Sequence, residues 1–194
     1  MVNAYVQIVP RADAAALLAN YHYLGKKAFI GVYIFGLFVD GVLVGACSFS
    51  PPSAPETVVG AFGLARHEQS TVFELSRFVL SAAHNGKNYG SMLLGRAIRL
   101  LKQLVKVDAI ITYADSERHV GALYQATNFH YCGLTTPKKD FYLPCGKLQS
   151  RGKTKGVAGE WRPRSQKHRY VLICSNRLNL KWPIQTYPKE LKIA

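Results

Sequence analysis

The chain has few acidic residues and no long apolar run. It carries 11 Asp and Glu against 25 Lys and Arg over 194 residues, a formal net charge of +14. A membrane helix needs roughly 18 consecutive apolar residues, and a signal peptide needs a basic start and a long apolar centre; the sequence offers neither. We therefore expect a soluble, cytosolic protein that associates with no membrane and binds polyanions.

Closely spaced cysteines are also missing. Cys47, Cys132, Cys145 and Cys174 lie far apart, with no CxxC or CxxxC spacing, so a cysteine-based zinc site is not expected. Buried free thiols are the simplest interpretation. Because 48% of the residues are hydrophobic, and because a domain commonly holds roughly 100 to 200 residues, we predict a single domain over residues 1–194.

The positive charge is concentrated in one segment. Residues 138–169 contain 10 of the 25 basic residues and only 2 of the 11 acidic ones. Within this segment, glycines and a proline break any apolar periodicity over residues 147–169. This composition predicts a long exposed basic loop, which is usually functional or mobile. A solvated linker is the alternative interpretation.

We expect this loop to contact the phosphates and bases of a nucleic acid. Lysine and arginine side chains neutralise phosphates and release counterions, and Trp161, beside Arg162 and Arg164, offers a stacking surface for an unpaired base. The predicted DNA-contacting residues are Arg151, Lys153, Lys155, Trp161, Arg162, Arg164, Lys167 and Arg169.

Ahead of the loop, strands alternate with helices. Two apolar runs joined by Asp40-Gly41 predict a β-hairpin within residues 31–52, and leucines spaced three and four apart predict a surface helix over residues 89–106. Further strands are predicted at residues 4–10, 70–80, 108–115, 129–134, 141–143 and 170–174, and short helices at residues 12–20 and 119–126.

The order of these elements resembles the fold of the GCN5-related N-acetyltransferase superfamily. The motif YQATNF, from Tyr124 to Phe129, is similar to the Tyr-x-x-x-Gly-Phe that closes the fourth helix of that fold, with Asn128 in place of glycine. Asn is the next best residue for a left-handed helix end. The resemblance implies an α/β (α+β) fold with a central mixed, largely antiparallel sheet flanked by helices and a long basic loop near the C-terminus.

The start of the long predicted helix departs from that superfamily. There the superfamily uses Arg or Gln-x-x-Gly-x-Gly or Ala, whose backbone N–H groups hold the pyrophosphate of coenzyme A. Here Met92 stands where a small residue is needed, which argues against acetyl-coenzyme A. Asn88, Gly90 and Ser91 are the predicted donor-binding residues. Ser91 either donates a hydrogen bond to the donor or caps the helix.

Several longer motifs resemble the Mom family of phage DNA-modification proteins. They are YHYLG at residues 21–25, ELSRF at 74–78, NYGSMLLGRAI at 88–98 and TYADSERHVGALYQATNFHYCG at 112–133, followed by the basic loop. The resemblance implies conversion of adenine N6 in double-stranded DNA to N6-carbamoylmethyladenine in the cytoplasm of the infected bacterium, which protects phage DNA from host restriction endonucleases. Because N6 is paired inside the duplex, the base must be extruded into a pocket.

Arg77 and Asp115 are the first catalytic candidates. In a regular strand Arg77 shares a face with the apolar residues 73, 75 and 79, where a cation needs a partner. That partner is a carboxylate, a phosphate or the donor's carbonyl group, with a structural ion pair as the alternative. Asp115 ends an apolar strand, at an edge where active-site groups of open α/β sheets collect. It either orients or deprotonates the adenine amine, or caps the following helix.

Further residues are assigned from the resemblance. Tyr124 stands where the acyltransferase fold places a proton-donating tyrosine, with a plain core tyrosine as the alternative. His22 and Tyr23 match the family's His-Tyr pair and lie in a loop that borders the acceptor site of this fold. His22, Asp115 and His119 also make a set of two histidines and one carboxylate that suits iron.

The implied product constrains the donor. Carbamoylmethyl is not an acyl group, so direct acyl transfer cannot form it, but N6-glycyl and N6-carbamoylmethyl adenine contain the same atoms. This favours transfer from an activated glycine, such as glycyl-tRNA or a thioester, followed by rearrangement. An acetyl-coenzyme A-dependent N-acetyltransferase and a non-enzymatic DNA-binding protein are the alternatives. The oligomeric state, a homodimer included, is left open.

Overall fold

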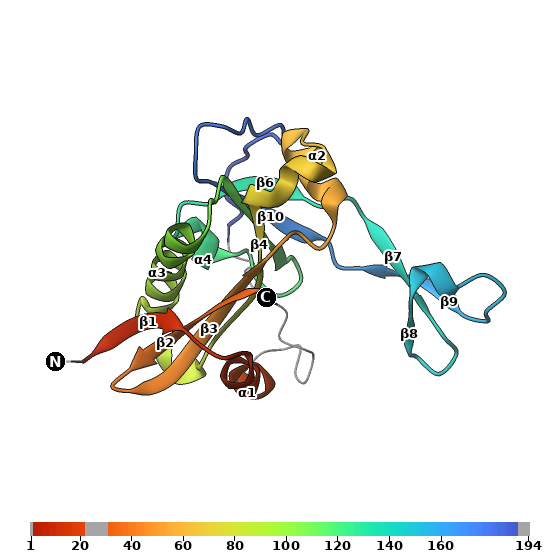
Figure 1. The fold of residues 1–194 in the computed structure, drawn as a ribbon. Helices are drawn as coiled ribbons and strands as arrows, with labels where there is room; N and C mark the ends of the chain where they lie inside the picture. Colours follow the sequence, from red (N-terminus) through yellow and green to blue (C-terminus); the bar gives the residue numbers. More distant parts are fainter. Residues whose placement is uncertain (1, 22–30, 190–194) are drawn as a thin grey trace.

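The computed structural model describes residues 2–21 and 31–189 and contains a seven-stranded sheet (Figure 1). The strand order is β1-β2-β3-β4-β5-β10-β6, and every neighbouring pair is antiparallel except β4 and β5. The strands are β1 (Ala4–Ile8), β2 (Tyr33–Val39), β3 (Val42–Ser50), β4 (Val72–Leu80), β5 (Ala109–Asp115), β6 (His130–Leu134) and β10 (Lys167–Ile173). The predicted mixed, largely antiparallel sheet is confirmed.

Helices cover both faces of this sheet (Figure 1). α3 (Tyr89–Leu104) and the short α4 (Ala122–Gln125) pack on one face, and α1 (Arg11–Tyr21) and α2 (Pro55–Phe62) pack on the other. Because strand residues alternate between faces, Ile110 lies in the core cluster under α3, whereas its neighbour Ile111 lies in the cluster under α2.

The structure adds one helix that the sequence interpretation did not assign. α2 begins with Pro55 in its first turn and ends at Gly63, which has a left-handed conformation with φ 75°. Both are ordinary boundary signals of a helix, but the helix spans only eight residues. The predicted hairpin is present as β2 and β3, and Asp40 (φ 47°) and Gly41 (φ 81°) form its turn.

A second, smaller sheet projects from the first (Figure 1). It consists of β7 (Lys138–Tyr142), β8 (Leu148–Gln149) and β9 (Glu160–Arg164), in the order β8-β7-β9. We call residues 138–164 the arm. The predicted loop over residues 147–169 is thus wrong where β8, β9 and the start of β10 lie within it. Cross-strand backbone bonding overrides the glycine-rich composition there. The predicted exposure is confirmed for β9, where all five residues are exposed.

The last described residues, 174–189, lie along β6 and α2 without regular secondary structure. The backbone N–H of Gln185 donates to the carbonyl oxygen of Tyr131 at 2.9 Å, and that of Lys181 donates to Ala61 at 2.7 Å. Trp182 packs in the cluster under α2. The backbone of this segment is therefore tied to β6 at Tyr131 and to α2 at Ala61.

The four cysteines differ in their exposure to solvent. Cys47 and Cys132 are buried and Cys174 is partly buried, but Cys145 is exposed, so the expectation of buried thiols is wrong at that position, which lies in the turn between β7 and β8. Across the part of the chain that is described, no helix combines the length and the apolarity needed to cross a membrane.

Candidate active site

A β-bulge interrupts β4 in the middle of the ELSRF motif. On β3, Ser48 pairs with Arg77 and the next residue, Phe49, pairs with Leu75. Ser76 is therefore an extra residue in β4, and such an insertion bends a strand and redirects its side chains. The hydroxyl group of Ser76 lies 2.5 Å from that of Ser50 on β3.

The bulge changes the face on which Arg77 lies. Before it, Phe73 and Leu75 belong to the cluster under α3; after it, Val79 belongs to the cluster under α1. Since residues two apart share a face, Arg77 lies with Val79 on the face that α1 and α2 cover. The prediction that Arg77 shares a face with residues 73 and 75 is wrong.

A pocket lies where β4 and β5 stop pairing. These strands pair only over residues 72–74 and 109–111, and the residues beyond line a cavity of about 380 Å³. Its walls come from β4, β5, the start of α2, the base of the arm and the start of β10. The lining residues are Ser53, Ala54, Thr57, Glu74, Leu75, Ser76, Arg77, Tyr113, Asp115, Thr135, Lys138, Arg164 and Lys167.

Arg77 lines this pocket and has one unsatisfied donor. Its Nη1 donates to the carbonyl oxygen of Ser76 at 2.7 Å, whereas its buried Nε has no hydrogen-bond partner among the described residues. Among the described residues Arg77 makes no ion pair. A buried donor without a partner is costly, so this group suits an acceptor on a ligand, and the structural ion pair that was the alternative is not seen in the described chain.

Asp115 faces the same pocket as the partner of Lys167. Lys167 Nζ donates to Asp115 Oδ2, and Arg118 Nε lies 4.0 Å from the same oxygen. Burial alone would raise the pKa of Asp115, but hydrogen bonds from Lys167 and Ser165, together with the charge of Lys167, lower that pKa below its ordinary value. The carboxylate is therefore charged at neutral pH, which suits it to accept and orient a donor group.

Asp115 does not cap α4. Its Oδ1 accepts a hydrogen bond from the backbone N–H of Glu117 at 3.2 Å, which closes a local turn. α4 begins only at Ala122, and its N-cap position is Gly121. The helix-cap alternative for Asp115 is therefore wrong, because the residues after β5 form a turn before the helix starts.

Tyr124 lies outside the pocket of Arg77 and Asp115. It is buried, its ring centroid lies 5.8 Å from that of Phe129 and 5.3 Å from that of Tyr170, and it belongs to the cluster under α3. It does not line the pocket of Arg77 and Asp115. Its position fits the core-tyrosine alternative.

The predicted donor-binding residues lie at the start of α3. Asn88 has a left-handed conformation (φ 58°), and no side chain caps this helix. Ser91 donates its hydroxyl to the carbonyl oxygen of Asn88 at 3.0 Å, so it does not act as the helix cap. The first N–H groups of a helix have no intrahelical acceptor, and a helix start favours a phosphate.

The space beside this helix start is partly filled by the chain's own side chains. A Cβ added at Gly90 would lie 3.4 Å from Leu123 and 3.8 Å from Phe78, and Met92 packs against the cluster under α3. The residues present therefore fit a phosphate at the helix start, and the side chains of Phe78 and Leu123 lie close to Gly90 beside it.

The proposed iron ligands are only partly described. His119 follows Asp115 by one turn, and its backbone N–H donates to the carbonyl oxygen of Asp115 at 3.0 Å. Burial lowers the pKa of His119. The described residues contain no group of three His, Cys, Asp or Glu side chains suited to a metal ion. His22 and Tyr23, assigned from the resemblance, lie outside the described residues.

The predicted DNA-contacting residues divide into two sets. Lys153, Lys155, Trp161, Arg162 and Arg164 are exposed on the arm, and Arg151 belongs to a short 3₁₀ turn there. The other two lie on β10 outside the arm. Lys167 pairs with Asp115 in the pocket. Arg169 lies over the ring of Trp182, 4.4 Å from its centroid, and donates to the carbonyl oxygen of Cys132 at 2.8 Å. The prediction that Arg169 belongs to an exposed loop is wrong.

Sequence interpretation missed several residues of the pocket. Glu74 accepts hydrogen bonds from the backbone N–H and the hydroxyl of Ser53, both at 2.9 Å. Glu74 and Ser76 belong to the ELSRF motif, so the motif itself was a signal for them. Lys138 and Tyr113 line the pocket only because β5 and the base of the arm meet there, and no local pattern indicates this.

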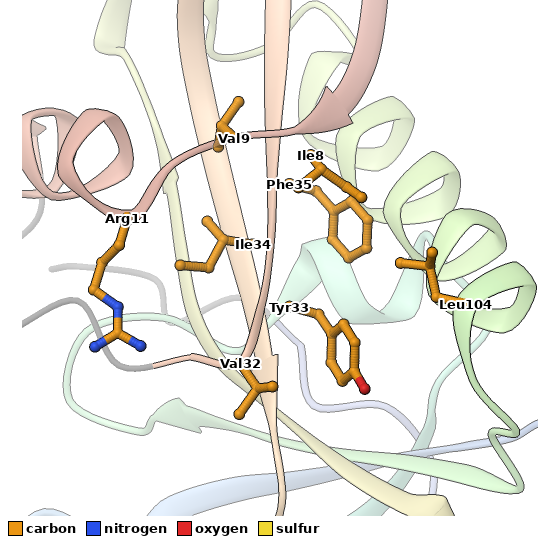
Figure 2. A pocket seen from close by; sticks show the side chains of 8 residues that line it. All are labelled: Ile8, Val9, Arg11, Val32, Tyr33, Ile34, Phe35 and Leu104. Atoms are coloured by element: carbon orange, nitrogen blue, oxygen red, sulfur yellow. The ribbon is translucent and has the colours of Figure 1, made fainter.

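A second pocket lies at the β1 edge of the sheet (Figure 2). It measures about 280 Å³ and is lined mainly by aliphatic and aromatic side chains. Arg11 is the only charged residue among those that line it; it donates to the carbonyl oxygen of Gly31 at 2.9 Å and lies apart from the rings of Tyr33 and Phe35. Among the described residues that line it, no pair of opposite charges corresponds to Asp115 and Lys167, and we take the first pocket as the candidate active site.

Solved acetyltransferases share this fold at low sequence identity. An N-acetyltransferase from Staphylococcus aureus Mu50 is 16% identical with a TM-score of 0.55, and the match covers 88% of this chain and 98% of that one. The ribosomal-protein-S18-alanine N-acetyltransferase from Escherichia coli is 12% identical with a TM-score of 0.55, covering 91% and 99%. This chain thus has the fold of these N-acetyltransferases.

Comparison of sequences gives the family. No curated protein matches the chain. The family model described as the Mom protein family matches residues 3–189, nearly the whole length. This chain therefore belongs to the Mom protein family.

Proposed function

We propose that this protein is a transferase that modifies adenine N6 in double-stranded DNA. Its product is N6-carbamoylmethyladenine, which protects phage DNA from host restriction endonucleases in the cytoplasm of the infected bacterium. One observation carries the proposal: Arg77 and Asp115 line one pocket, and the base of the basic arm completes the wall of that pocket.

The pocket supports a nucleobase as the acceptor. Small-molecule sites commonly measure roughly 300 to 1,000 Å³, and this cavity measures about 380 Å³. An enzyme that acts on a paired base must extrude it and hold the distorted backbone with cationic contacts. Lys138 and Arg164 line the pocket from the arm, which places positive charge next to the cavity.

Asp115 and Arg77 take complementary roles in this proposal. The exocyclic amine of adenine donates hydrogen bonds and is a weak nucleophile, because its lone pair is delocalised into the ring. Asp115, kept charged by Lys167, accepts an N6–H and orients the amine. The Nε of Arg77 donates to the carbonyl oxygen of the donor, where negative charge develops during attack.

The donor in this proposal is an activated glycine, glycyl-tRNA or a thioester. Attack of N6 on the glycyl carbonyl forms an N6–carbonyl bond, breaks the bond to the carrier, and passes the N6 proton to the released carrier. The rearrangement then breaks the N6–carbonyl and CH2–N bonds and forms N6–CH2 and carbonyl–N bonds. Product and intermediate are isomers, so no oxidant or reductant is needed.

Two features support a carrier that presents phosphates without an extended thioester arm. The start of α3 has no side-chain cap and suits an anion, while Leu123 and Phe78 lie close to Gly90 beside it. The excess of positive charge also favours a nucleic-acid carrier. Feeding expressing cells labelled glycine tests this donor, and an unlabelled modified adenine would contradict it.

Mass spectrometry of nucleosides tests the function itself. DNA from cells that express the wild-type chain should contain a deoxyadenosine in which a carbamoylmethyl group replaces one hydrogen. Asp115→Asn should lose this product while still binding duplex DNA; Asp13→Asn, an exposed aspartate of α1, is the matched control. A wild-type chain that leaves DNA unmodified under infection conditions would overturn the proposal.

An N-acetyltransferase that uses acetyl-coenzyme A is the second candidate, favoured by the shared fold. Tight binding of acetyl-coenzyme A with no DNA-dependent activity would support it. Loss of modification in an Asp115→Asn variant that still binds duplex DNA would count against a non-enzymatic DNA-binding protein. Activity of the purified protein that survives a chelator would count against a metal-assisted route through iron.

A further inference from the structure

The arm has two chemically different faces. In the ladder of β7 and β9, Lys138 pairs with Arg164 and Asp140 pairs with Arg162, and the intervening pairs are Lys139 with Pro163 and Phe141 with Trp161. Neighbouring pairs point to opposite faces of a sheet. One face therefore carries three cross-strand pairs: Lys138 with Arg164, Asp140 with Arg162, and Tyr142 with Glu160. The other face carries Lys139, Pro163 and the aromatic pair.

The aromatic face holds the arm together. The rings of Phe141 and Trp161 meet edge to face with centroids 5.3 Å apart, and Phe141 is buried although it belongs to none of the three core clusters. Trp161 thus lies on the opposite face from Arg162 and Arg164. Its indole ring is exposed, so the prediction that it offers a stacking surface for an unpaired base stays a prediction.

The charged face leads into the pocket. Lys138 and Arg164, the cross-strand pair nearest the large sheet, both line the cavity that contains Arg77 and Asp115. Arg164 Nη1 lies 3.7 Å from Asp140 Oδ1. Lys138 is exposed, and within the described chain no carboxylate forms an ion pair with it. Farther along the same face, Arg162 Nη2 forms an ion pair with Glu160 Oε1 at 2.5 Å, and the guanidinium group of Arg162 lies 5.0 Å from the centroid of the Tyr142 ring.

We propose that Lys138 and Arg164 are the positioning residues that hold the DNA phosphates next to the extruded adenine, and that the charged face of the arm follows the same strand. This rests on the proposed function for its substrate. The two side chains present positive charge at the wall of the cavity, so they act on the backbone of the nucleotide that enters it. Lys139, one residue away, points to the other face and takes no part.

The adjacent lysines allow a matched experiment. Lys138→Gln and Lys139→Gln remove the same charge one residue apart on opposite faces. Binding of each purified variant to an adenine-containing duplex is measured from low to physiological salt. Lys138→Gln and Arg164→Gln should each weaken binding roughly tenfold and lower the slope of log K against log salt by about one. Lys139→Gln should change binding less than about threefold.

Steady-state kinetics provide the second readout. In Lys138→Gln the KM for DNA should rise by a larger factor than kcat falls, because the residue holds the backbone and does not touch the reacting atoms. Thermal unfolding of both lysine variants should match the wild type. Equal losses of duplex binding in the two lysine variants would overturn the proposal. It would also be overturned if Lys138→Gln lost binding to tRNA while its binding to duplex DNA stayed intact.

The failure of this inference is distinguishable from failure of the proposed function. If the wild type binds duplex through Lys138 but yields no modified adenine, the function is wrong and the phosphate contact stands. If the wild type modifies adenine and Lys138→Gln behaves like Lys139→Gln, the function stands and the assignment of this face is wrong.

Discussion

The seven-stranded sheet and the arm are both β-structure, but different interactions stabilise them. Helices cover both faces of the sheet, and large side chains such as Phe35 and Phe129 are fully buried there. In the arm, every residue of β9 is exposed and the main packing contact is the pair of Phe141 and Trp161. The sheet can therefore fix the geometry of Arg77 and Asp115, whereas the arm contributes positive charge that extends beyond the sheet.

The same substitution in the two regions gives the largest expected contrast. Phe129→Ala removes a side chain with no exposed surface and should lower the free energy of unfolding by about 3 to 5 kcal/mol. Phe141→Ala should leave the unfolding of the large sheet within about 0.5 kcal/mol of the wild type, because Phe141 contacts none of the core clusters. Denaturant unfolding followed by circular dichroism measures both, and equal losses would show that the arm and the sheet form one cooperative unit.

Arg77 tests whether the chemistry depends on the sheet alone. Arg77→Met removes the buried donor of the pocket and should lower the rate of modification on the order of 100-fold, with duplex binding within about twofold of the wild type. Arg66→Met is the matched control, since Arg66 pairs with Glu56 where both side chains are well exposed. A comparable loss of duplex binding in Arg77→Met would place Arg77 among the DNA contacts instead.

Substitutions at two glycines test whether duplex binding depends on the structure of the arm. A Cβ at Gly159 would overlap the carbonyl oxygen of Tyr142 and lie 2.6 Å from Phe141, whereas one at Gly152 meets nothing within 4 Å. Gly159→Ala should therefore separate β9 from β7 and weaken duplex binding roughly tenfold by dispersing the charged face. Gly152→Ala should bind like the wild type. Both variants should unfold at the wild-type temperature, and a lower melting temperature for Gly159→Ala alone would argue against an independent arm.

The predictability of the fold follows the same division. The apolar period of α3 and the apolar runs of β2 and β3 are local patterns, and they give these elements nearly at their observed bounds. The arm has no such pattern, because its strands are exposed and its glycines favour loops. Its order comes from pairing between segments about twenty residues apart, which composition does not reveal.

The candidate site shows where local patterns fail. Asp115 was predicted at the end of β5 from the position of a polar residue after an apolar strand, and it lies in the pocket. The face of Arg77 was predicted wrongly, since a bulge at Ser76 shifts the alternation by one residue. The pairing of Asp115 with Lys167 joins residues 52 positions apart, so only the tertiary structure reveals it.

Lowering the pH should destabilise the large sheet and leave the arm unchanged, and this is the smallest effect of the series. Burial lowers the pKa of His119, and burial and the nearby charge of His119 lower that of His168, each from an ordinary value of 6.5. Below that pH the unfolded chain binds more protons than the native one, so the stability of the large sheet should fall as pH drops from 8 toward 5. The arm contains no histidine and contributes nothing to this slope. Thermal unfolding at several pH values measures the effect; His168→Gln should reduce the slope, and His67→Gln, at an exposed position, should leave it unchanged. If His168→Gln keeps the full slope, buried histidines in the sheet are not its source.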